Sequence, residues 1–109
     1  MFYYCSNLIS LDLSSFDTSS VTTMRYMFYQ CSNLILLDLS SFNTPSVDNM
    51  NSMFYNCTKL ISLNLTNFNA PSSTNMNSMF VGCSNQLIYC IYNANYLLEY
   101  ITQIYKIFF

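Results

Sequence analysis

The chain repeats itself every 26 residues, and this period restricts the possible folds more than any other feature of the sequence. One cysteine and several large apolar residues recur in step. They occupy the equivalent positions Met1/Met27/Met53/Met79, Cys5/Cys31/Cys57/Cys83, Leu8/Leu34/Leu60, Leu11/Leu37/Leu63, Leu13/Leu39/Leu65, Phe16/Phe42/Phe68 and Met24/Met50/Met76. A unit this short cannot bury its apolar face alone, so neighbouring units must stack.

Three full units occupy residues 1–26, 27–52 and 53–78, and a partial fourth occupies 79–85. We interpret residues 1–85 as one repeat domain and residues 86–109 as a C-terminal helical cap or tail. In the tail, Tyr96, Leu97, Tyr100, Ile101 and Ile104 fit one helical face that could cover the last unit. An amphipathic surface anchor is the alternative, although the cationic face typical of such helices is missing.

Within each unit the apolar pattern changes from a helical to an extended period. Val21, Met24, Phe28 and Cys31 share one helical stripe with Met27, which predicts a helix of about three turns. Thr44 before Pro45 is typical of an N-cap followed by proline at the first helical position, and Thr18 holds the equivalent place.

The following segment, "LILLDLS", alternates. It predicts a short strand with one set of side chains inward and the other outward. The inward set is Ile35, Leu37 and Leu39, and the outward set is Leu36, Asp38 and Ser40. The expected fold class is therefore α/β, with a short parallel sheet backed by helices and about three stacked units.

These motifs carry a resemblance to a known family. The combination "LxxLDLSxFxT" with "MFxxC" upstream, in register from Met1 to about Asn85, resembles the BspA-like leucine-rich repeats of surface proteins in mucosal bacteria and some protists. The resemblance implies a curved leucine-rich-repeat solenoid in a secreted or surface-anchored protein that adheres to host or neighbouring cells. The chain shows neither the signal peptide nor the anchor expected of that family, so we expect that it could be a fragment.

Charge excludes one class of partner. Charged residues make up 7% of the chain, with three cationic side chains and a formal net charge of −2. There is no basic patch to neutralise phosphates, so we expect no nucleic-acid binding. No stretch has the roughly 18 uninterrupted apolar residues of a membrane span, so none is expected.

The outward face of the predicted sheet is the candidate binding surface, because solenoids commonly bind there. Its columns are Ser10/Leu36/Ser62, Asp12/Asp38/Asn64 and Ser14/Ser40/Thr66. This polar, nearly uncharged face suits a protein surface or a glycan. It could equally bind nothing within these three units, if a longer array carries the binding site elsewhere.

We expect no catalytic, cofactor or metal site. Asp12 and Asp38 stand on neighbouring strands, but no histidine, third acid or Gly-rich phosphate loop converges on them. The four repeated cysteines lie on separate units and are interpreted as buried thiols, because stacked helices are about 8–10 Å apart and a disulfide needs Cα atoms within about 7 Å. Cys90 does not follow the 26-residue period, and a disulfide between Cys83 and Cys90 is an alternative that the sequence does not decide.

The sequence therefore favours a non-enzymatic recognition or adhesion module, at the cell surface or secreted by resemblance. The alternative is an intracellular repeat scaffold that mediates assembly with other proteins. An upstream signal peptide would favour the first and reduced cysteines in a cytosolic chain the second. Because no N-terminal cap is visible, we also expect self-association through uncapped repeat ends.

Overall fold

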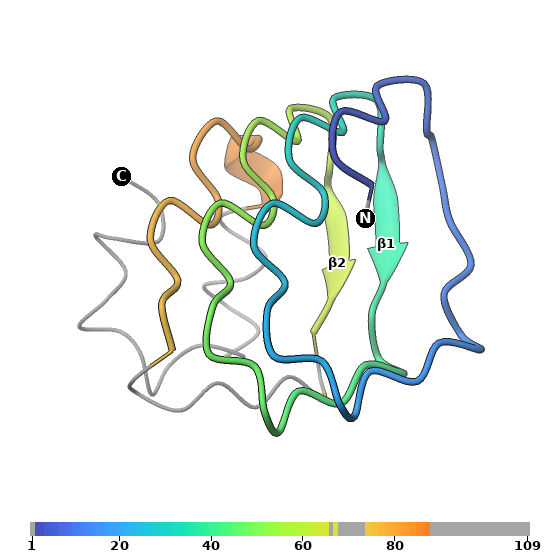
Figure 1. The fold of residues 1–109 in the computed structure, drawn as a ribbon. Coiled ribbons are helices and arrows are strands. Elements are labelled where there is room, and N and C mark those ends of the chain that lie inside the picture. The colour runs from blue at the N-terminus through green and yellow to red at the C-terminus, as the bar shows by residue number, and fades with distance from the viewer. Residues whose placement is uncertain (1, 66, 68–73, 88–109) are drawn as a thin grey trace.

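The parallel sheet joins equivalent residues of successive units. The computed structural model describes residues 2–65, 67 and 74–87, and its two strands are β1, Leu36–Asp38, and β2, Ser62–Asn64. They pair in parallel, with Leu37 opposite Leu63 and Asp38 opposite Asn64 (Figure 1). This is the 26-residue register that the repeat predicts. Its side chains alternate, so that Leu37 is buried while Leu36 and Asp38 are exposed.

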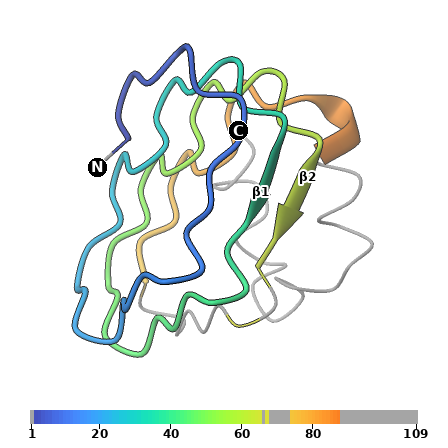
Figure 2. The same ribbon diagram turned by 90° about the vertical axis from the view of Figure 1, so that its right-hand side faces the viewer.

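The other side of each unit is also joined to its neighbours through the backbone. Figure 2 shows successive passes of the chain running side by side there. Isolated parallel bridges connect Thr23 with Asn49 and Asn49 with Asn75. Amide groups of alternate residues in one unit donate to carbonyl groups 25 residues later, from Met24, Tyr26, Phe28 and Gln30 to Asn49, Asn51, Met53 and Tyr55 at 2.7–3.1 Å.

The helix predicted from Val21 to Cys31 is absent, and that prediction is wrong. Residues 25–30 form turns, and Thr23 before them forms an isolated bridge. The amides of Met27, Tyr29 and Cys31, which do not reach the neighbouring pass, bond to the carbonyl groups three residues back, as Met27 does to Met24. A helix satisfies its amides internally, whereas this segment sends every second one to the neighbouring unit.

Two residues with positive φ in each unit make this turn geometry. In the second pass they are Tyr26 (φ 59°) and Gln30 (φ 57°), and in the third they are Ser52 and Asn56. Non-glycine residues seldom adopt this left-handed conformation, so it persists because surrounding bonds hold it. In the fourth unit Gly82 takes the second of these positions, with φ 79°.

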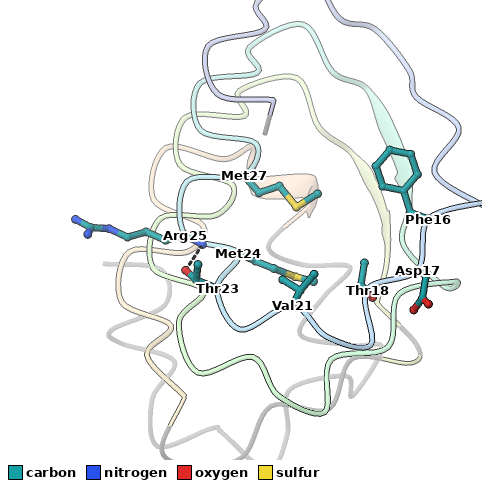
Figure 3. Close-up of a pocket in the computed structure, with 8 residues that line it drawn as sticks. All are labelled: Phe16, Asp17, Thr18, Val21, Thr23, Met24, Arg25 and Met27. Atoms are coloured by element: carbon teal, nitrogen blue, oxygen red, sulfur yellow. Dashed lines mark hydrogen bonds between the residues drawn. The ribbon is translucent and has the colours of Figure 1, made fainter.

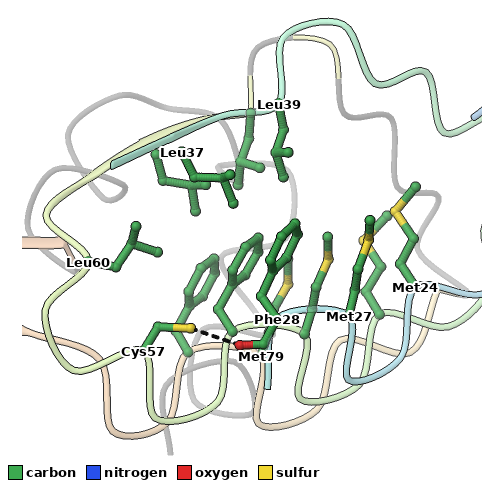
Figure 4. Packing of buried hydrophobic residues seen from close by; sticks show 14 of the residues in the cluster. Met24, Met27, Phe28, Leu37, Leu39, Cys57, Leu60 and Met79 are labelled. Atoms are coloured by element: carbon green, nitrogen blue, oxygen red, sulfur yellow. Dashed lines mark hydrogen bonds between the residues drawn. The ribbon is translucent and has the colours of Figure 1, made fainter. Parts of the chain in front are cut away.

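The core lies between the strands and the turn segments. In Figure 4, Leu37 and Leu39 face Phe28 and Met27 across it. At its centre stands a column of phenylalanines, one from each unit, whose ring centroids are 5.4–5.5 Å apart and whose planes are within 10° of parallel. The column consists of Phe2, Phe28, Phe54 and Phe80. Each ring meets an equivalent ring, which explains why the same residue recurs.

The prediction that Thr18 and Thr44 are N-caps is wrong, because no helix follows either residue in the described part of the chain. Thr18 is buried, and its hydroxyl donates to the carbonyl of Asn43 at 2.8 Å and accepts from the amide of Asn43 at 3.0 Å. It therefore links the first unit to the second. Thr44 is also buried.

The predicted boundary between repeats and tail falls near the end of the described residues. Residues 85–87 form a helical turn, and Leu87 is fully buried in the core cluster. The predicted cap from residue 88 onward lies outside the described residues. A search of the described residues for a helix with the length and hydropathy of a membrane span finds none.

Candidate functional site

The predicted sheet face is exposed where the structure describes it. Ser10, Asp12, Ser14, Leu36, Asp38 and Ser62 are exposed, and Ser40 and Asn64 are half-buried. Thr66 lies outside the described residues. The register places Leu36 beside Ser62 and Asp38 beside Asn64, as the predicted columns require.

A ladder of exposed aliphatic side chains borders this face. It was not predicted from the sequence. Ile9, Ile35 and Ile61 are 60%, 38% and 43% exposed, and Leu36 beside them is 53% exposed. The prediction that Ile35 points inward is wrong. Ile35 precedes β1, and its amide bonds to the carbonyl of Ile9, so the alternation that buries Leu37 does not extend back to it. The 26-residue spacing of the three isoleucines was the available signal.

The two aspartates of the face each stabilise a backbone turn, and they do not form an acid/base pair. The carboxylate of Asp38 accepts from the amide of Ser40 at 2.9 Å, and that of Asp12 accepts from the amide of Ser14 at 3.0 Å. Each closes a turn as its strand segment ends. Hydrogen bonds from the serine side chains, and then those from the serine amides, lower the pKa of both carboxyl groups, so both are ionised at neutral pH. A shared proton would require one pKa to rise.

The cysteine column consists of free thiols, as predicted. Cys31 and Cys57 are buried, and Cys5 and Cys83 are partly buried. Each thiol after the first donates to a phenylalanine carbonyl 29 residues earlier, and the distance from the Cys31 sulfur to the Phe2 oxygen is 3.0 Å. Burial raises the pKa of Cys83 to about 12, which leaves it protonated and unreactive at neutral pH. Cys90 lies outside the described residues.

All tyrosines within the described residues gather in one cluster on the turn side of the units. We call this cluster, Tyr3, Tyr4, Tyr26, Tyr29 and Tyr55, the tyrosine ridge. Tyr3, Tyr29 and Tyr55 occupy one repeat position, and their rings stack with centroids 5.2 and 4.9 Å apart. Tyr4 and Tyr26 stand nearly perpendicular to Tyr29, with interplanar angles of 73° and 76°.

The ridge is half-open to solvent and nearly neutral. Tyr3 and Tyr4 are 50% and 52% exposed, while Tyr29 is half-buried. The Arg25 guanidinium lies 4.4 Å from the Tyr26 ring centroid and donates to its hydroxyl at 2.7 Å. Desolvation by neighbouring rings raises the pKa of Tyr3 and Tyr29, so both phenols stay protonated. Sequence reasoning missed this ridge, although its period was visible.

A pocket of about 260 Å³ opens at the first unit (Figure 3). Its apolar lining includes Phe16 and Val21, and Asp17 and Arg25 stand among its polar lining residues. The equivalents of Phe16 and Val21 in the next unit, Phe42 and Val47, are buried. The pocket thus belongs to the stacking surface of the repeat.

No group of three or more metal-ligating side chains occurs within the described residues. The polar side chains at the unit edges instead bond across units. The Asn33 amide donates to the carbonyl of Ser6 at 2.6 Å, and the Thr58 hydroxyl donates to that of Ser32 at 3.3 Å. Uncharged side chains do this without placing like charges beside one another.

Comparison with known proteins places the chain in a family. A family model described as "Mycoplasma protein of unknown function, DUF285" matches residues 1–89. No curated protein and no solved structure matches the chain. Because the family match covers most of the 109 residues, this chain belongs to the DUF285 family.

Proposed function

We propose that this chain is a non-enzymatic recognition module, built as a leucine-rich-repeat solenoid, that binds a protein surface or a glycan through its exposed sheet face. The observation that carries the proposal is the aliphatic ladder of Ile9, Ile35 and Ile61 with Leu36, which stays exposed beside polar columns. Apolar residues surrounded by polar ones are typical of interaction sites. This arrangement favours a protein surface over a glycan.

The resemblance to BspA-like repeats supports a role in adhesion, at the cell surface or after secretion. The polar part of the face supports it as well. Asp12 and Asp38 use a carboxylate oxygen to hold a turn, while the columns beside them carry the exposed hydroxyl groups of Ser10 and Ser62. The face thus combines polar columns with an apolar ladder along its border.

Binding of fluorescently labelled chain to intact cells tests the proposal. Leu36→Asp combined with Ser62→Lys places opposite charges on two paired positions, and we expect at least a tenfold loss of binding with an unchanged melting temperature. Ser46→Asp, at an exposed position outside the three columns, is the matched control and should bind normally. Protease treatment of the cells should abolish binding to a protein partner, and glycosidase treatment should abolish binding to a glycan. Normal binding by the double variant would refute the sheet face as the site.

A scaffold that assembles with other repeat chains is a second candidate, favoured by the pocket at Phe16 and Val21. That surface resembles the one that each unit offers its neighbour, so another repeat unit would fit it. Sedimentation of purified chain distinguishes the two roles. Concentration-dependent assembly that Phe16→Asp abolishes would favour the scaffold, and a monomer that still binds cells would favour recognition.

A further inference from the structure

The chain sorts its aromatic residues by polarity. At adjacent positions of each unit, Phe28 and Phe54 enter the core, while Tyr29 and Tyr55 lie at the half-open surface behind them. The core requires the phenylalanine column, but nothing in the core requires phenol groups at the next position. In the fourth unit Val81 holds that position, so the stacking of units tolerates an aliphatic side chain there.

The stacked phenols form a row with a constant step. Tyr3, Tyr29 and Tyr55 provide one phenol per unit, with ring centroids 5.2 and 4.9 Å apart. An extended β-1,4-linked pyranose chain advances by nearly the same distance per sugar. The stacked rings cover one another's faces, so each phenol offers a sugar its outer edge and its hydroxyl group, which both donates and accepts hydrogen bonds. A protein surface without internal repeats has no such regular row of identical groups.

Charge on the ridge restricts the partner further. The ridge residues include no carboxylate, and the neighbouring cation, Arg25, is already engaged by the ring and hydroxyl of Tyr26. One cation cannot match a polymer that carries a charge on every sugar or every second sugar. The surface therefore suits an uncharged chain of hydroxyl groups.

We propose that the tyrosine ridge is a second binding surface, which takes a linear uncharged β-1,4-linked polysaccharide lying along the column of Tyr3, Tyr29 and Tyr55. This site lies on the turn side of the units and is separate from the sheet face of the proposed function. The row of phenols in step with the repeat carries the inference.

Isothermal titration of the full chain with cellohexaose and with chitohexaose tests this site. We expect saturable binding of at least one of them and at least tenfold weaker binding of maltohexaose, whose α-linked chain coils away from a straight row. Tyr29→Val copies the residue that the chain itself carries at position 81, and it should weaken binding at least tenfold. Tyr29→Phe keeps the stack without the hydroxyl and should weaken binding about fivefold.

Ser46→Asp, at an exposed position outside both surfaces, is the matched control and should bind the hexasaccharides normally. If Tyr29→Val melts below the assay temperature, Tyr29→Phe alone decides the test. Absence of saturable binding to both β-1,4-linked probes would overturn the proposal, as would normal binding by the folded Tyr29 variants. Loss of cell binding in Tyr29→Val without any saccharide binding would assign the ridge to a protein partner, and this too would overturn it.

Discussion

The thiol of Cys57 donates a hydrogen bond to the carbonyl oxygen of Phe28, which lies one unit earlier and 3.1 Å away (Figure 4). Cys31 and Cys83 make the same bond to Phe2 and Phe54. The repeated cysteine is therefore a small core residue that also joins neighbouring units. This role explains its period without a metal or a disulfide within the described residues.

Thiol labelling should follow burial. Cys57 is fully buried, and desolvation raises its pKa well above the usual value, whereas Cys5 is partly exposed. In native chain at pH 8, we expect maleimide to label Cys5 first and Cys57 only after urea is added. Peptide mass spectrometry measures both rates. Labelling of Cys57 as fast as that of Cys5 in the native state would contradict the described packing.

Phenylalanine truncation should cost more in the second unit than in the first. Phe42 and Phe16 hold the same repeat position, but Phe42 is 0% exposed and Phe16 is 37% exposed. We expect Phe42→Ala to lower the free energy of unfolding by about 3–5 kcal/mol and Phe16→Ala to lower it by less than half as much. Urea denaturation measures both. Equal losses would mean that the two positions have similar surroundings.

The buried hydroxyl of Thr18 should be necessary for stability. It both donates to and accepts from the backbone of Asn43, so Thr18→Val leaves two backbone groups without their partner. We expect a loss of about 1–3 kcal/mol in unfolding free energy. Thr18→Ser keeps the hydroxyl and serves as the control, with a clearly smaller loss. If both variants lose the same amount, the missing methyl group and not the hydrogen bonds would be responsible.

Stability should fall in acid because the turn aspartates must be ionised. Asp12, Asp17 and Asp38 each have a pKa below the usual 3.8, caused first by hydrogen bonds from serine. A lowered pKa in the folded state stabilises the fold above pH 3.8, and this contribution disappears as the pH falls through the lowered value.

Asp38→Asn tests that assignment. Asparagine keeps the oxygen that accepts from Ser40, as Asn49 does for Asn51, but it does not titrate. Thermal melts between pH 2 and pH 7 should therefore show a weaker decline for Asp38→Asn than for the natural chain. Asp38→Ala, which removes the acceptor, should be less stable already at pH 7. Identical pH profiles for the natural chain and Asp38→Asn would exclude this carboxylate as a contributor.

The register of the units was predictable from the sequence because it follows from chemistry that repeats. Leu37 faces Leu63 for the same reason that both recur, since each meets the same neighbours. The outward positions of Leu36 and Asp38 were also predictable from the alternation of β1. The sequence did not predict that turns, and not helices, form the side of each unit opposite the strands.

The helix prediction failed because two conformations bury the same residues. Met24, Met27 and Phe28 point into the core from turns as they would from a helix, so their spacing cannot distinguish the two. The deciding residues are Tyr26 and Gln30, whose positive φ values have no glycine or other marker in the sequence. Tyr26 and Gln30 would avoid positive φ in an isolated chain, but the hydrogen bonds from their amides to the next unit hold them in this conformation.

The surfaces were predicted in part. The polar columns followed from the strand pattern, whereas the aliphatic ladder was missed because Ile35 lies just before β1, where alternation no longer applies. The tyrosine ridge was missed because a large aromatic next to a core phenylalanine looks like core. Only the packing of Tyr29 against Tyr3 and Tyr55 separates it from the core.

Disulfide trapping of paired positions tests the central claim that successive 26-residue units lie side by side in register. Leu36 and Ser62 are direct partners on exposed positions of β1 and β2, so Leu36→Cys with Ser62→Cys places two thiols within bonding reach. We expect mild oxidation to join these two positions in most molecules, and to join Leu36→Cys with Asn64→Cys in few. Preferential bonding of Leu36→Cys to position 64, or to neither, would contradict the register on which the fold and both surfaces depend.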